Sequence, residues 1–134
     1  MEKYPIGTRA ESERLVREWG FRDVFTWTDG RWGSSLITLG TVAGFALHSY
    51  LHIIRISCAD TSSNHHYAPH SHRGLTTHLI RRGCLTITYP EDHALYHGEV
   101  KKETFGVGER VDVPAGKVHE VWIGADGCEY VIGE

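Results

Sequence analysis

Four of the ten histidines in this chain of 134 residues lie in one short segment, from His65 to His72. Alternate side chains of an extended strand share a face, so His70 and His72 can direct two imidazoles toward one point. His66 joins them on that face if the strand extends back that far. Because neutral imidazole is a common ligand of Zn, Fe, Mn, Ni or Cu, the spacing predicts part of a metal site. Paired histidines also arise by chance, so the prediction depends on what else converges there.

Another histidine closes a segment marked by glycine and proline. Residues 108–119 read GERVDVPAGKVH, in which glycine is followed by five residues, Pro-x-Gly, two residues and His119. This order resembles the second motif of the cupin family at each of its fixed points. The first cupin motif has two histidines one residue apart and a glycine at a set distance, and His70, His72 and Gly83 resemble it. The two motifs together carry the resemblance.

The resemblance covers residues 64–134 and, less securely, the strand before Asp29. It implies an all-β fold, the cupin jelly-roll β-barrel, with His70, His72 and His119 pointing into the barrel. It also implies that these histidines surround a divalent transition metal, which is Fe, Mn, Ni or Zn.

Two positions depart from the family pattern. Thr76 stands where many cupins have glutamate, and Ile123 stands where an asparagine often closes the second motif. A hydroxyl is a poor metal ligand at neutral pH, so the site has either three histidines with open positions or four, with His78 as the fourth. His78 lies two residues beyond Thr76 and faces the same way in a regular strand. The alternative roles of His78 are a hydrogen-bond donor beside the ligands and a buried core histidine.

The missing carboxylate changes the electrostatics of the predicted site. Neutral imidazoles leave the full charge of a dication in the cavity, which favours a small anionic or chelating oxygen ligand. The residues predicted to line the cavity are Thr76, His66, Ile123, Tyr67 and Tyr130. No catalytic residue is assigned from the sequence.

These features favour a mononuclear metal-dependent enzyme that acts on a small oxygen-chelating metabolite. Oxygenation and metal-assisted isomerisation both stay open, the second because a metal ion polarises a carbonyl or enediol as a Lewis acid. The alternative is a non-enzymatic cupin that binds a small ligand or has a structural role, with a vestigial metal site. Fold alone does not decide between these functions.

Length and composition exclude several other classes. With 40% apolar and 23% charged residues, the chain is one globular domain over residues 1–134. The net charge is −3 and the basic residues are scattered, so nucleic acid is not an expected partner. Cys58, Cys84 and Cys128 form no CxxC pair, and without a secretory signal they indicate buried thiols in a cytoplasmic protein.

The remaining elements follow from periodicity and turn residues. The spacing of Thr8 and Glu11 is that of a capping box and predicts an amphipathic helix over residues 8–20. Runs of β-branched residues between glycine and proline turns then predict a small antiparallel barrel. The predicted strands are Phe21–Thr28, Tyr67–His72, His78–Ile80, Cys84–Tyr89, Glu99–Phe105, Arg110–Val113, Val118–Ile123 and Cys128–Ile132. Edge strands of so small a barrel favour a homodimer.

Residues 30–63 fit this pattern least well and are predicted to be a hydrophobic insertion before the first metal motif. Residues 34–54 contain no Lys, Arg, Asp or Glu and approach the length of a membrane-spanning helix. Their glycines, serines and histidines argue against a membrane span and favour a buried helix or hydrophobic β-hairpin. A translated intervening segment of the gene is a further alternative. The segment is expected to lie outside the metal cavity, so His48 and His52 are not expected to be ligands.

Overall fold

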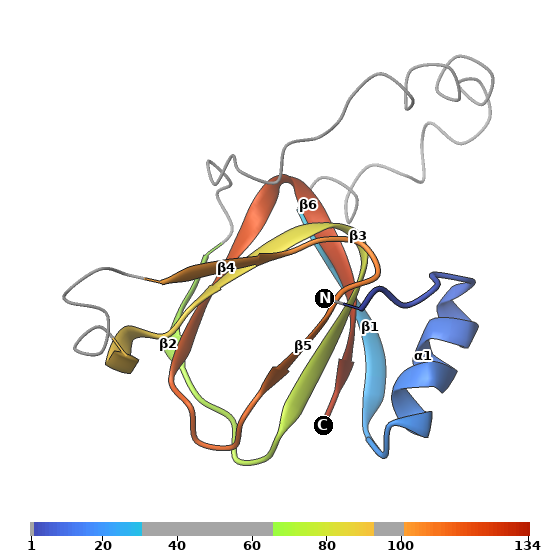
Figure 1. Cartoon of the computed structure of the whole chain (residues 1–134), viewed down its shortest axis with the longest axis horizontal. Coiled ribbons are helices and arrows are strands. Elements are labelled where there is room, and N and C mark those ends of the chain that lie inside the picture. Colours follow the sequence, from blue (N-terminus) through green and yellow to red (C-terminus); the bar gives the residue numbers. More distant parts are fainter. Residues whose placement is uncertain (1, 31–65, 93–100) are drawn as a thin grey trace.

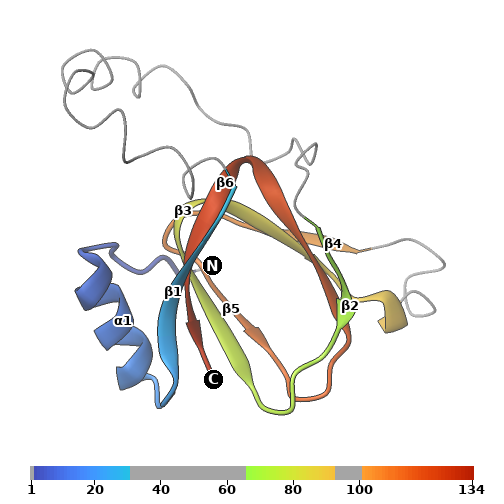
Figure 2. The same cartoon turned by 180° about the vertical axis from the view of Figure 1, so that it is seen from behind.

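The computed structural model describes residues 2–30, 66–92 and 101–134, which form one α-helix and six antiparallel strands (Figure 1). The elements are α1 (Arg9–Glu18), β1 (Val24–Asp29), β2 (His66–His70), β3 (Thr76–Thr88), β4 (Lys102–Phe105), β5 (Arg110–Val113) and β6 (His119–Gly133). All six strands belong to a single sheet that curves strongly, and α1 lies outside it beside β1 (Figure 2). The predicted all-β class with a short N-terminal helix is confirmed.

Specific residues begin and end the helix that was predicted over residues 8–20 and is observed as α1. The Thr8 hydroxyl accepts a hydrogen bond from the backbone N–H of Glu11, and the Glu11 carboxylate accepts one from the backbone N–H of Thr8. Gly20 follows the last turn with a φ of +101°, a conformation that glycine adopts without steric cost. Val16 is fully buried against β3 and β6, so the helix covers their outer face.

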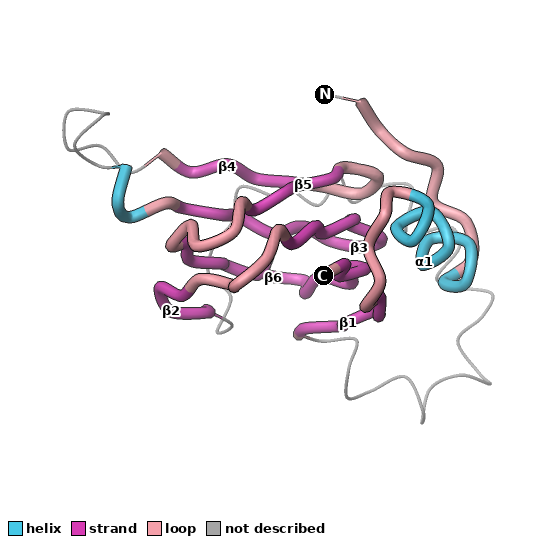
Figure 3. Tube along the Cα trace, turned by 90° about the horizontal axis from the view of Figure 1, so that it is seen from below, coloured by secondary structure: helices cyan, strands magenta, loops and turns pink. Residues whose placement is uncertain are grey.

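Strand β6 is the centre of the sheet and is paired along both edges (Figure 3). On one edge β3 runs antiparallel to it from the pair Thr77–Gly133 to the pair Thr88–Glu120. On the other edge β1 pairs with residues 128–133, and β2 pairs with residues 119–122. One edge of β6 is therefore paired with a single continuous strand, β3. The other edge is paired with two short strands, β1 and β2, that lie end to end.

Two turns predicted from glycine residues, between residues 80 and 84 and between residues 123 and 128, are instead bends inside the long strands β3 and β6. The predicted strands concerned are His78–Ile80 and Cys84–Tyr89, which fall largely within β3, and Val118–Ile123 and Cys128–Ile132, which fall largely within β6. Register shifts flank Gly83, and both Gly83 and Gly127 have positive φ angles, +68° and +92°. A Cβ atom on Gly83 would lie 2.0 Å from the Gly127 carbonyl oxygen. Glycine thus lets the two strands bend and cross closely without ending either of them.

The other predicted strands are close to the observed ones. Arg110–Val113 is β5 without change, and Glu99–Phe105 overlaps β4, although residues 99 and 100 lie outside the described ranges. β1 begins at Val24 rather than at Phe21, and the Phe21 side chain packs with the cluster beneath α1.

Most of the predicted insertion, residues 30–63, lies outside the described residues, and so do His48 and His52. Its first residue, Gly30, has a φ of +89°, and a Cβ atom there would lie 2.7 Å from the Cα of Gly127. The chain therefore leaves β1 at a position that only glycine tolerates. In the part of the chain that the structure describes, no helix is long and apolar enough to cross a membrane.

The larger group of buried apolar side chains connects β3, β4, β5 and β6. It consists of Ile80, Leu85, Ile87, Phe105, Val111, Val113, Val121, Ile123, Cys128 and Tyr130. Burying a side chain of this size contributes roughly 1.5–3 kcal/mol. β3 and β6, which carry His78 and His119, are thus held in place by apolar packing.

Candidate metal centre

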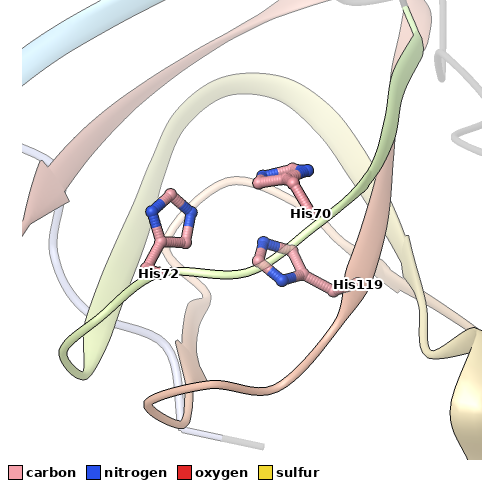
Figure 4. A group of neighbouring side chains, drawn as sticks. All are labelled: His70, His72 and His119. Atoms are coloured by element: carbon pink, nitrogen blue, oxygen red, sulfur yellow. The ribbon is translucent and has the colours of Figure 1, made fainter.

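Three histidines, from the end of β2, the turn that follows it and the start of β6, lie close together (Figure 4). His70 ends β2 and pairs directly with His119, the first residue of β6, while His72 lies two residues further along the chain. Their possible ligand nitrogens all lie within 4.8 Å of one another. The ring centroids of His70 and His119 are 4.3 Å apart. The structure thus brings together the three histidines that the two sequence motifs single out.

The tautomers of two of these rings are set by backbone carbonyls. The Nδ1 atom of His70 lies 2.7 Å from the carbonyl oxygen of Ala68, and that of His119 lies 3.0 Å from the carbonyl oxygen of Lys117. A carbonyl oxygen can only accept, so each Nδ1 carries the proton and each Nε2 keeps a free lone pair. Histidines that bind metals are commonly oriented in this way by a carbonyl or carboxylate on the other nitrogen.

The third ring has a carboxylate nearby, beyond hydrogen-bond distance. The Nδ1 atom of His72 lies 3.7 Å from Oε1 of Glu134, which also lines the cavity. The backbone of Glu134 is held by hydrogen bonds with Arg22 and Asp23, just before β1. No sequence motif marks Glu134, and only the curvature of the sheet brings this residue, just after the end of β6, close to His72.

A cavity of about 310 Å³ opens beside the triad. Its walls combine aliphatic, aromatic and imidazole side chains. They are Phe25, Trp27, Tyr67, His70, His72, His78, Leu85, His119, Val121, Tyr130, Ile132 and Glu134. A mostly apolar cavity with a few convergent polar groups is the usual form of a small-molecule site.

His78 lines this cavity from β3 but is not part of the group of three. Its side chain is 7% exposed, and its Nδ1 atom has no hydrogen-bond partner among the described residues. Burial, and then the neighbouring His119, lower the pKa of His78 to about 4, so the ring is neutral at pH 7. Burial also lowers the pKa of His119, which keeps that imidazole available as a neutral ligand.

Of the five residues predicted to line the cavity, Tyr67 and Tyr130 do so, whereas Thr76, His66 and Ile123 do not. Ile123 is 1% exposed within the apolar core. Thr76 is 2% exposed, and its hydroxyl has no partner among the described residues.

His66 lies away from the triad for a reason visible in the backbone. The pairing register of β2 with β6 shifts between Tyr67 and His70, so the alternation of side chains is broken there. The ring of His66 instead stacks on Trp122 with centroids 3.7 Å apart, and it lies 3.4 Å from Glu120. The prediction that His66 shares the face of His70 assumed a regular strand, and the bulge makes it wrong.

A buried carboxylate that the sequence analysis did not single out stands behind the aromatic wall of the cavity. Asp29, at the end of β1, is 7% exposed and accepts three hydrogen bonds. The donors are the Tyr67 hydroxyl at 2.8 Å and the Trp27 indole N–H at 3.0 Å, both to Oδ1, and the Tyr130 hydroxyl at 2.8 Å to Oδ2. Burial and the Asp29 carboxylate raise the pKa of both phenols, so both stay protonated.

When this chain is compared with known proteins, matches are found only among solved structures. No protein-family model matches the chain, and no curated protein matches it. A cupin-2 domain protein from Shewanella frigidimarina is similar at 20% identity with a TM-score of 0.42, covering 52% of this chain and 59% of that one. This chain therefore spans less than two thirds of the length of that relative.

Two enzymes are similar at the same level. Oxalate decarboxylase from Bacillus subtilis, with Mn(II) centres, has 18% identity and a TM-score of 0.41 over 50% of this chain and 17% of that one. A polyketide cyclase from Streptomyces resistomycificus has 20% identity and a TM-score of 0.41 over 50% and 43%. Likeness at these scores gives no information on substrate or reaction. The curved antiparallel sheet, with the histidines of both motifs brought together, agrees with the jelly-roll barrel that the resemblance of the two motifs implies.

Proposed function

We propose that this chain binds one divalent transition metal ion through His70, His72 and His119 and acts as a metal-dependent enzyme on a small oxygen-chelating metabolite. The observation that carries the proposal is the convergence of three imidazoles, two of which have a fixed tautomer with Nε2 free. Three neutral nitrogen ligands suit Zn, Fe or Ni, and Mn stays open. When bound, the metal would act as a Lewis acid toward an oxygen of the ligand.

The chain's own residues supply the surroundings of that ion. In the metal-bound protein we expect Glu134, now 3.7 Å from His72 Nδ1, to close on that ring and orient it, and its carboxylate to offset part of the dication charge that three neutral ligands leave. His78, neutral and with a free Nδ1 atom, offers a hydrogen bond to a ligand in the cavity. Apolar walls such as Leu85 and Val121 exclude water from the ligand. Nothing in this arrangement selects oxygenation over isomerisation, and both reaction types stay within the proposal.

The first test is the metal content of protein purified without a histidine tag. We expect about one ion of Fe, Mn, Ni or Zn per chain, and a rise in melting temperature when metal is returned to chelator-treated protein. Ligand binding to the native state stabilises it by mass action, by about 2.7 kcal/mol at a hundred times the dissociation constant. Anomalous scattering from crystals would then identify the ion. A protein that stays metal-free and does not respond to any of the four ions would instead be a non-enzymatic cupin with a vestigial site.

A further inference from the structure

The Asp29 carboxylate differs from the other buried polar groups of the cavity because it is charged and surrounded by aromatic donors. Its three partners are Trp27, Tyr67 and Tyr130, and all three line the cavity. Among the described residues, no cationic side chain forms an ion pair with Asp29. A buried charge without a counter-ion is costly unless it is fully hydrogen-bonded or a ligand supplies the opposite charge.

The hydrogen bonds of Asp29 determine what the cavity presents to a ligand. A carboxylate can only accept, so the single hydroxyl proton of Tyr67 and that of Tyr130 both point to Asp29. The two phenol oxygens can therefore offer only lone pairs to anything in the cavity. A ligand group that donates hydrogen bonds fits this wall, whereas a group that only accepts them, such as a carboxylate, does not.

The aromatic residues around Asp29 further limit which hydrogen-bond-donating group of a ligand fits this wall. Phe25 and Trp27 lie on β1 beside Tyr67 and Tyr130, and the exposed fractions of Phe25 and Trp27 are 41% and 48%. Aromatic faces attract cations, and the attraction grows as water is excluded. A buried carboxylate with no cationic partner among residues 2–30, 66–92 and 101–134, two acceptor oxygens and aromatic surfaces all favour a positive charge with N–H groups.

We infer that this wall of the cavity binds a protonated amine. Because the inference rests on the proposed metal site, it deepens that function: the ligand is a small zwitterion or amino compound, with an oxygen group toward the histidine triad and an ammonium group toward Tyr67 and Tyr130. Asp29 is a positioning residue in this arrangement, since it acts on the ligand through the two phenols.

The test compares two probes of nearly the same shape, benzylamine and benzyl alcohol, by calorimetric titration at pH 7. Metal-free protein is used first, so that the amine has no ion to coordinate. We expect benzylamine, which is protonated at this pH, to bind about tenfold more tightly than the alcohol, a factor that corresponds to about 1.4 kcal/mol. Equal affinity of the two probes would overturn the inference.

Variants then assign the preference to Asp29. Asp29→Asn keeps the shape but removes the charge and turns a phenol proton toward the cavity, so we expect the preference for the amine to disappear. Tyr67→Phe removes one acceptor oxygen at a half-exposed site and is expected to reduce the preference about threefold even if Asp29→Asn fails to fold. Tyr89→Phe, at a tyrosine outside the cavity, is the matched control and keeps the full preference.

Two further results separate this inference from the metal proposal. Loss of the preference in Glu134→Gln, with full preference in folded Asp29→Asn, would assign the amine to the other carboxylate and overturn the inference. His119→Ala is expected to lose metal binding while keeping the amine preference in metal-free protein. A protein that never binds metal but distinguishes the probes would therefore refute the proposed function alone.

Discussion

The two edges of β6 contrast in both continuity and chemistry. The edge paired with β3 is one long strand, whose inward polar side chains include Thr76 and His78, and neither the Thr76 hydroxyl nor the His78 Nδ1 has a partner among the described residues. The edge paired with β1 and β2 is divided into two short strands, and it carries His70 and Asp29, both of which are hydrogen-bonded. The divided edge therefore holds these two polar groups in fixed orientations, whereas the Thr76 hydroxyl and the His78 Nδ1 on the continuous edge are available to another partner.

This difference indicates separate tasks for the two edges. Metal ligands must keep one nitrogen aimed at the ion, which requires a partner on the other nitrogen, and His70 has one in the carbonyl of Ala68. A buried polar atom without a partner costs about 1–3 kcal/mol and is expected where a ligand completes the hydrogen bonding. Thus the divided edge binds the metal in our proposal, and His78 on the continuous edge awaits a ligand.

The largest expected effect is the loss of a metal ligand on the divided edge. His70→Ala should weaken metal binding by more than about a hundredfold, since even residues that only orient the ligands are worth about 10- to 100-fold. Competition with a chelator of known affinity measures this loss. The control is His66→Ala, four residues earlier on the same strand but stacked on Trp122 away from the triad. Equal losses in the two variants would contradict the assignment of the site.

On the continuous edge, His78 should make folding stability depend on pH. Its pKa is about 4 in the folded protein and 6.5 as the ordinary value, so the unfolded chain binds more protons in this interval. Stability from this group is complete above pH 6.5 and is lost as pH falls toward 4, by about 2 kcal/mol between pH 7 and pH 5. His78→Phe should remove that part of the dependence. Urea unfolding of metal-free protein at both pH values measures it, and an unchanged slope would mean that His78 is not buried as a neutral ring.

The sequence predicts best those features that depend on a few residues close together along the chain. The spacing to His119 and the capping box at Thr8 depend on local order along the chain, and both were predictable. The strand bulge that separates His66 from His70 was not, because periodicity assumes a regular strand. Glu134 and Asp29 were missed for another reason: His72, the neighbour of Glu134, and the two tyrosines that donate to Asp29 lie far away in sequence, and only the curvature of the sheet brings them together.

A smaller loss is expected when the carboxylate beside His72 is neutralised. Glu134→Gln should reduce metal affinity about tenfold, the lower end of the range for groups that orient a metal-binding histidine. Glu120→Gln is the matched control, because Glu120 also lies beside a histidine, His66, but away from the cavity. If both variants bind metal as the original protein does, Glu134 has no part in the site.

The smallest effect on metal binding is expected from removing residues 31–63, which lie between β1 and β2 along the chain. The Tyr67 hydroxyl and the Asp29 carboxylate are 2.8 Å apart, so β1 and β2 are in contact across the interruption, and a connection of about four residues is an ordinary length for such neighbours. The variant replaces residues 31–63 with a short Gly-Ser connector and retains Gly30, whose positive φ and contact with Gly127 exclude other residues. We expect a folded protein whose metal affinity changes by less than about threefold, since the triad and its partners lie outside the deleted range. Circular dichroism and chelator competition measure the two properties. An unfolded product would show that the deleted residues complete the barrel, and folded protein without metal affinity would show that they hold the divided edge in place.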